Sequence, residues 1–109
     1  MDTNVAERIQ SAIESNKIVI YMKGSASFPM CGFSAATVEV FNELGVPYAT
    51  VDVLKDPEIR DGIKRFSNWP TIPQVYIDGK FVGGCDIIRE MHASGELEPL
   101  VRGALDSRA

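Results

Sequence analysis

The chain has 109 residues, of which 45% are hydrophobic and 24% charged, so it carries enough apolar material for one core. We therefore expect a single globular domain over residues 1–109 that needs no disulfide bond. The net charge of −4 argues against a nucleic-acid surface, and no apolar run is long enough to cross a membrane.

The chain begins without the basic region and the apolar stretch of a signal peptide. This favours a cytoplasmic protein, or one of an organelle matrix if a presequence has been removed. The two cysteines, Cys31 and Cys85, lie far apart in the sequence. In a reducing compartment such a pair is more often reactive or metal-binding than a structural bridge.

The first predicted element is a helix that Asn4 caps and Ser15-Asn16 ends. Its inner face is apolar and consists of Val5, Ile9, Ala12 and Ile13. The segment from Lys17 to Met22 follows, and after its first residue it is an unbroken apolar run of β-formers. Such a run is typical of a strand that is buried on both faces.

A second helix is predicted from Gly32 to Leu44, with Gly45 placed to end it. Its inner face is expected to hold Phe33, Ala36, Val40, Phe41 and Leu44. The segment from Lys23 to Ser34 connects this helix to the preceding strand, and we expect the function to depend on it.

Cys31 is thereby predicted to lie at a strand-to-helix corner. Unpaired N–H groups and the positive end of the helix dipole favour a thiolate there, and Lys23 can add a positive charge. The alternative is that Cys31 is a small buried hydrophobe. We disfavour it, because a helix start after Pro29 and beside Gly32 is usually an exposed corner.

Tyr48 to Asp52 is predicted to form a second strand, parallel to the first, because a helix joins the two by a right-handed crossover. Asp56-Pro57 then starts a third helix, Pro57 to Phe66, with Ile59, Ile63 and Phe66 facing inward. The same helix carries Arg60, Lys64 and Arg65. We interpret Lys64 and Arg65 as a solvated basic face.

Gln74 to Ile77 is the third predicted strand. The turn signal Asp78-Gly79 joins it to Phe81-Val82 in an antiparallel hairpin. The next predicted element is a helix that begins at Cys85-Asp86 and runs through Ser94. The last is a short amphipathic segment from Leu97 to Leu105. This order predicts an α/β fold with a four-stranded mixed sheet flanked by helices on both faces.

The element order, with a cysteine after the first strand and a Thr-x-Pro before the third, resembles the thioredoxin fold. Four local sequences narrow the resemblance to the monothiol glutaredoxins, the class marked by a Cys-Gly-Phe-Ser active site. They are Lys23, Cys31-Gly32-Phe33-Ser34, Trp69-Pro70-Thr71-Ile72-Pro73 and Gly83-Gly84-Cys85-Asp86. The resemblance covers essentially the whole chain. Two departures are the less polar loop before Cys31 and Ile72, where many members have Phe.

Ser34 stands where a dithiol motif has its second cysteine. Cys31 therefore cannot complete the intramolecular exchange and needs an external thiol. The resemblance implies that this thiol is glutathione, and it implies five contacts for it. Lys23 and Arg60 bind the glycine-end carboxylate, Ile72 pairs with the peptide backbone, and Cys85 and Asp86 bind the other end.

Two further expectations concern this site. Pro73 is predicted to follow a cis peptide bond, an expectation that depends on the fold resemblance. Asp86 has an alternative interpretation as a helix cap, which is compatible with ligand binding. Cys85 is either a backbone contributor or a slow resolving thiol for Cys31.

A 2Fe-2S cluster generally needs four thiolate ligands. The resemblance implies that Cys31 and one glutathione from each of two subunits supply them. It further implies a carrier for iron–sulfur cluster assembly and iron homeostasis. Its partners would be a second copy, as a cluster-bridged homodimer, or a BolA-like protein, and the cluster would pass to apo iron–sulfur recipient proteins.

Two alternatives stay open. The first is a glutathione-disulfide oxidoreductase that attacks protein–glutathione mixed disulfides through Cys31. Ser34 in place of a second cysteine and the long loop before Cys31 argue that any such oxidoreductase activity is weak. The other alternative is a thioredoxin-fold adaptor with inert thiols.

Overall fold

A four-stranded mixed sheet with the order β2-β1-β3-β4 forms the centre of the molecule in a computed structural model that describes residues 3–106. Strand β1 is parallel to β2 and antiparallel to β3, and β3 pairs with β4 in a hairpin. The bounds are β1 Ile18–Met22, β2 Ala49–Asp52, β3 Gln74–Ile77 and β4 Lys80–Gly83. The predicted mixed sheet is thus confirmed.

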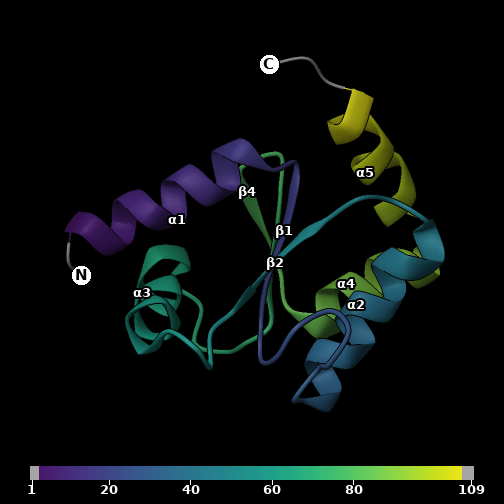
Figure 1. Ribbon diagram of the computed structural model, residues 1–109. Helices are drawn as coiled ribbons and strands as arrows, with labels where there is room; N and C mark the ends of the chain where they lie inside the picture. Colours follow the sequence, from purple (N-terminus) through teal and green to yellow (C-terminus); the bar gives the residue numbers. More distant parts are fainter. Residues whose placement is uncertain (1–2, 107–109) are drawn as a thin grey trace.

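Five helices cover the sheet (Figure 1), with α1 and α3 on one side and α2, α4 and α5 on the other. Their bounds are α1 Thr3–Ser15, α2 Gly32–Leu44, α3 Pro57–Ser67, α4 Cys85–Ser94 and α5 Leu97–Asp106. Helices on both faces confirm the predicted α/β architecture. No helix within residues 3–106 has the length and apolar character needed to span a membrane.

Every residue of β1 is buried, as its apolar run predicts. Alternate side chains of a strand point to opposite faces, so this strand contributes to two separate core clusters. Ile18, Ile20 and Met22 pack with α2, α4 and α5, whereas Val19 and Tyr21 pack with α1 and α3. Strand β1 is therefore held from both faces, and the loop that leads to Cys31 starts from its end at Met22.

Two backbone features expected from the sequence, one from a local turn signal and one from the fold resemblance, are present in the structure. Asp78 and Gly79 both have positive φ, 54° and 77°, which is the geometry of a type I′ hairpin turn. The Ile72–Pro73 peptide bond is cis, as predicted.

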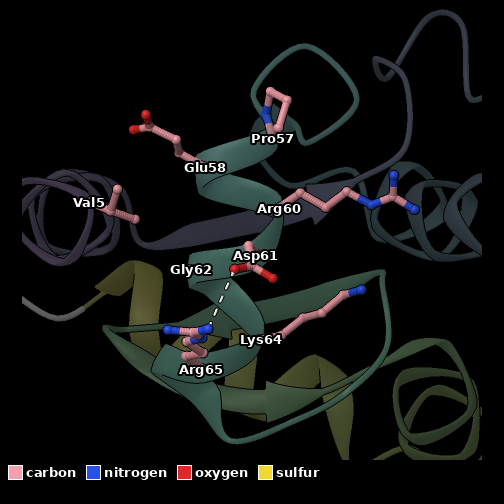
Figure 2. A pocket seen from close by; sticks show the side chains of 8 residues that line it. All are labelled: Val5, Pro57, Glu58, Arg60, Asp61, Gly62, Lys64 and Arg65. Carbon is pink, nitrogen blue, oxygen red and sulfur yellow. Dashed lines mark ion pairs between the residues drawn. The ribbon is translucent and has the colours of Figure 1, made fainter. Parts of the chain in front are cut away.

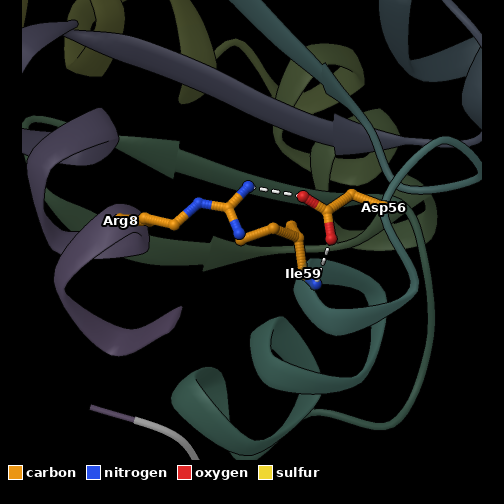
Figure 3. Close-up of polar contacts among 3 residues, drawn as sticks. All are labelled: Arg8, Asp56 and Ile59. Carbon is orange, nitrogen blue, oxygen red and sulfur yellow. Dashed lines mark hydrogen bonds and ion pairs between the residues drawn. The ribbon is translucent and has the colours of Figure 1, made fainter. Parts of the chain in front are cut away.

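Helices α1 and α3 are joined by an ion pair between Arg8 and Asp56 (Figure 3). The same Asp56 caps α3, since its Oδ1 accepts a hydrogen bond of 3.2 Å from the Ile59 N–H. The side-chain hydrogen bond from Arg8 is the main cause that lowers the pKa of Asp56, and the bond from Ile59 adds to it.

Two sequence-based expectations about the helices are wrong. Asn4 lies inside α1, which already includes Thr3, so Asn4 does not cap this helix. Phe33 is 63% exposed, although the spacing predicts it on the inner face of α2. The inner positions of the first turns are held by Ser34 and Thr37, both fully buried. The helical spacing predicts the apolar Phe33 on the inner face of α2, whereas in the structure the polar Ser34 and Thr37 lie there.

Candidate functional site

Cys31 is the residue that starts α2, with extended backbone angles of φ −153° and ψ 137°. Its carbonyl accepts the first helical hydrogen bond, 2.9 Å from the Ala35 N–H. The thiol is partly exposed and free. This position agrees with the predicted strand-to-helix corner and differs from that of a buried hydrophobe.

The surroundings of the thiol favour its ionised form. The backbone N–H of Ser34 is the main cause that lowers the pKa of Cys31, and the N–H of Phe33 and the charge on Lys23 act in the same direction. These are the donors of a helix start and a nearby cation, both of which stabilise an anion. The site therefore holds a nucleophilic sulfur.

Ser34, at the place of a second thiol in dithiol relatives, is fully buried. Its Oγ accepts a hydrogen bond of 3.1 Å from the backbone N–H of Lys23. The side chain thus ties the end of β1 to the start of α2, and it is not free to react.

A cavity of about 500 Å³ lies beside Cys31. Five of the six residues predicted for the site line it: Lys23, Cys31, Ile72, Cys85 and Asp86. The wall also includes Lys64, Trp69 and Thr71, which sequence reasoning did not assign to the site. The cavity therefore lies where four segments meet: the end of β1, the start of α2, the loop before β3 and the start of α4.

Arg60, the sixth predicted residue, does not line this cavity. It lines a neighbouring one of about 590 Å³ on the outer side of α3, together with Glu58 and Asp61. Lys64 lines both cavities, and Figure 2 shows its side chain and that of Arg60 extending to the same side of α3. Residues four apart share a helix face, so this spacing is the signal that would have found Lys64.

The loop before β3 forms one wall and is held from beneath by Gln74, which is fully buried. The Gln74 amide donates hydrogen bonds to the carbonyl oxygens of Trp69, at 3.0 Å, and Thr71, at 3.2 Å. The indole of Trp69 also packs on Phe81, with ring centroids 5.7 Å apart. The wall is therefore fixed by contacts with both strands of the hairpin.

The start of α4 forms an adjoining wall, and Gly84 holds the N-cap position just before this helix. A Cβ on Gly84 would lie 3.1 Å from the Pro73 carbonyl oxygen, so the two walls meet closely there. Asp86 makes no cap, since Gly84 holds the cap position and no side-chain bond forms there. The cap interpretation is wrong because the helix begins two residues earlier than an Asp86 cap requires.

The arrangement suits a small anionic molecule that carries a thiol. Lys23 and Lys64 offer positive charge, the start of α4 offers N–H donors, and Asp86 offers an acceptor for an amino group. Cys85 lies in the same wall but is only 6% exposed. Within residues 3–106, no group of three or more His, Cys, Asp or Glu side chains is placed to hold a metal ion.

Comparison with known proteins shows the family of this chain. The Glutaredoxin family model matches residues 18–82. An uncharacterised monothiol glutaredoxin of Synechocystis sp. is 50% identical over 107 residues, which cover 98% of this chain and 100% of the relative. The solution structure of reduced poplar apo GrxS14 has a TM-score of 0.83 and 44% identity, and 93% of each chain is covered.

A crystal structure of a buckwheat glutaredoxin–glutathione complex has a TM-score of 0.82 and 28% identity, and the match covers 93% of this chain and 92% of that one. These similarities establish the family, and the sequence Cys31-Gly32-Phe33-Ser34 agrees with them. The chain belongs to the glutaredoxins, and within them to the monothiol class.

Proposed function

We propose that this chain is a glutathione-dependent carrier of 2Fe-2S clusters that acts in iron–sulfur cluster assembly and iron homeostasis. The observation that carries the proposal is a single thiolate-favouring sulfur, Cys31, in a cavity whose remaining charges match glutathione. Reduced thiols of this kind suit the cytoplasm or an organelle matrix.

Glutathione binding is the first part of the proposal. The tripeptide carries two carboxylates, an amino group and a thiol, and it has about the size that a cavity of about 500 Å³ accepts. In this proposal Lys23 and Lys64, which line the cavity, bind one carboxylate, and the first N–H groups of α4 at Cys85 and Asp86 bind the other. The buckwheat glutaredoxin, which shares this fold, forms a complex with glutathione.

Ile72 contributes to this site through its backbone, since its side chain is buried at 9% exposure and packs in the core cluster with α1 and α3. An extended backbone segment before a proline can pair with the backbone of a bound peptide. Arg60 stays a proposed contact from the adjoining turn of α3, one turn before Lys64.

Cluster binding is the second part. Iron–sulfur clusters are held by thiolates, and the residues present fit that need only in part. Cys31 is one suitable ligand, whereas Cys85 is buried. Two subunits that each contribute Cys31 and one glutathione thiolate complete a set of four. Because half of these ligands exchange with solution, such a site suits transfer to apo iron–sulfur recipient proteins.

The surface around Cys31 supports the approach of another protein chain. Phe28, Met30 and Phe33 are 76%, 66% and 63% exposed, and all three lie within three residues of Cys31. Contiguous exposed apolar side chains of this size are typical of interaction surfaces. A second copy of this chain or a BolA-like protein would cover them.

The second candidate function is a glutathione-disulfide oxidoreductase. The lowered pKa and partial exposure of Cys31 favour it. The thiolate would attack the glutathione sulfur of a protein–glutathione mixed disulfide, the protein thiolate would leave, and a second glutathione would restore Cys31. Ser34 does not replace that second thiol, because it is buried and hydrogen-bonded to Lys23.

Anaerobic reconstitution with iron, sulfide and glutathione tests the proposal. We expect a visible chromophore in a species that elutes as a dimer, and its loss in Cys31→Ser or without glutathione. Cys85→Ser is the matched thiol control and should retain the chromophore. A colourless monomer in every sample, together with rapid deglutathionylation that depends on Cys31, would favour the oxidoreductase.

A further inference from the structure

Asp52, the last residue of β2, reaches across to the loop that carries Cys31. Its Oδ1 accepts hydrogen bonds from the backbone N–H of Gly24 and from that of Leu54, both at 3.0 Å. We propose that Asp52 is a positioning residue that holds Lys23 and the Cys31 loop in their ligand-binding geometry. The inference deepens the proposed glutathione site and rests on it.

The peptide group between Lys23 and Gly24 is held on both sides. Its N–H donates to Asp52, and its carbonyl accepts a hydrogen bond of 2.8 Å from the Met30 N–H. The N–H of Lys23 itself donates to Ser34 Oγ at 3.1 Å. All three polar groups around the Lys23 backbone are therefore satisfied, by the far end of the loop, by α2 and by β2.

Asp52 is the only one of these partners that lies outside the loop and α2. The bond from Met30 lies within the loop, and the bond to Ser34 joins Lys23 to α2. Asp52 stands on the sheet, where β2 is paired with β1 from Ala49 to Asp52. Its carboxylate therefore ties the loop to the sheet, in addition to the contact that Ser34 makes from α2.

The backbone here is closely packed. Gly24 has φ +91°, and a Cβ placed on it would clash with the Phe28 carbonyl oxygen. The loop is thus packed tightly against its own first residues. Lys23 needs such an anchor because a free lysine side chain has many rotamers, and a fixed backbone restricts which of them reach the cavity.

The role we assign depends on the hydrogen bond and not on the charge of Asp52. A negative charge near Cys31 would by itself disfavour the thiolate, so its removal would raise thiol reactivity. Loss of the tie has the opposite effect, because Lys23 would then spend less time near the sulfur that it helps to ionise. The sign of the change therefore separates the two roles.

Asp52→Ala and Asp52→Asn remove the same charge, but only the asparagine retains an oxygen acceptor. Asp106→Ala, on the exposed end of α5, is the matched control for the change in net charge. The measurement is the rate of Cys31 alkylation by iodoacetamide across pH, resolved by peptide mass spectrometry so that Cys85 does not contribute. The glutathione dissociation constant of each variant is measured alongside.

We expect Asp52→Ala to slow alkylation at pH 7 by about two- to tenfold, a loss of the size of one hydrogen bond, and to weaken glutathione binding. Asp52→Asn and Asp106→Ala should stay within about twofold of the wild type. Unchanged or faster alkylation in Asp52→Ala would overturn the proposal, and so would an equal loss in Asp52→Asn.

Amide hydrogen exchange in the wild type provides a test that does not depend on a variant folding. The N–H of Gly24 should be protected, and in Asp52→Asn it should stay so. An unprotected Gly24 amide in the wild type would overturn the proposal. Alkylation needs neither cluster nor glutathione, so a failure of cluster binding and a failure of the Asp52 assignment are distinguishable.

Discussion

Ser34 Oγ and the backbone N–H of Lys23 are joined by a hydrogen bond of 3.1 Å, and Ser34 is fully buried. In Ser34→Ala this N–H loses its acceptor in a region with little access to water. We expect the free energy of unfolding to fall by about 1–3 kcal/mol, as measured by urea denaturation. Ser94→Ala, on the exposed end of α4, is the control and should change stability much less. Equal losses in the two variants would contradict the role of Ser34.

The pH dependence of Cys31 alkylation follows from its lowered pKa. The thiolate should persist below the ordinary thiol range and be lost as pH falls through the lowered value. In Lys23→Gln the pKa should rise, and the rate at pH 7 should fall. Lys80→Gln, at the exposed start of strand β4, is the control. A profile in Lys23→Gln that coincides with the wild type would show that Lys23 does not act on the sulfur.

Lys64 and Arg60 extend to the same side of α3, but they differ in the cavities that they line. Lys64 lines the Cys31 cavity and Arg60 does not. We therefore expect Lys64→Gln to weaken glutathione binding several-fold and more than Arg60→Gln does, as measured by NMR titration. Arg65→Gln, which removes an exposed charge from the same helix, serves as the control. A larger effect of Arg60→Gln would reverse the assignment.

Gln74 supports the cavity wall from within the core. In Gln74→Leu the carbonyl oxygens of Trp69 and Thr71 lose their donor. We expect a loss of about 1–3 kcal/mol in unfolding free energy and weaker glutathione binding, measured on the same sample. If glutathione affinity is unchanged in a destabilised variant, the wall does not depend on Gln74 for its shape.

Asp56 should make stability depend on pH. Its folded-state pKa is lowered chiefly by the hydrogen bond from Arg8, so its contribution is complete above the ordinary carboxyl pKa and is lost as pH falls through the lowered value. The urea midpoint of the wild type should fall over that range more steeply than that of Asp56→Asn. Asp61→Asn, an exposed carboxylate of α3, should leave the wild-type profile unchanged. Parallel profiles for wild type and Asp56→Asn would contradict the assignment.

Much of the fold follows from local signals in the sequence. The β1 run is apolar because both of its faces are covered, and this needs no knowledge of which helix covers which face. The Asp78-Gly79 turn and the Gly45 end of α2 are likewise fixed by backbone conformations that few residues adopt. The cis Pro73 was predictable only through the family resemblance.

What the sequence could not predict depends on how elements are oriented toward one another. Phe33 is exposed because the start of α2 faces the ligand cavity and not the core. Lys64 was interpreted as solvated because helical periodicity shows which residues share a face but not what that face borders. The tie from Asp52 to Gly24 joins residues that are 28 positions apart, and no short-range pattern indicates it.

Trp69 is the only tryptophan in the sequence, and it stands in the wall of the Cys31 cavity against Phe81. Nearly all of the protein's fluorescence under selective excitation of tryptophan therefore originates in the wall of the Cys31 cavity. The molecule carries its own optical probe, and the filling of its cavity is open to observation in the unmodified chain without any attached dye.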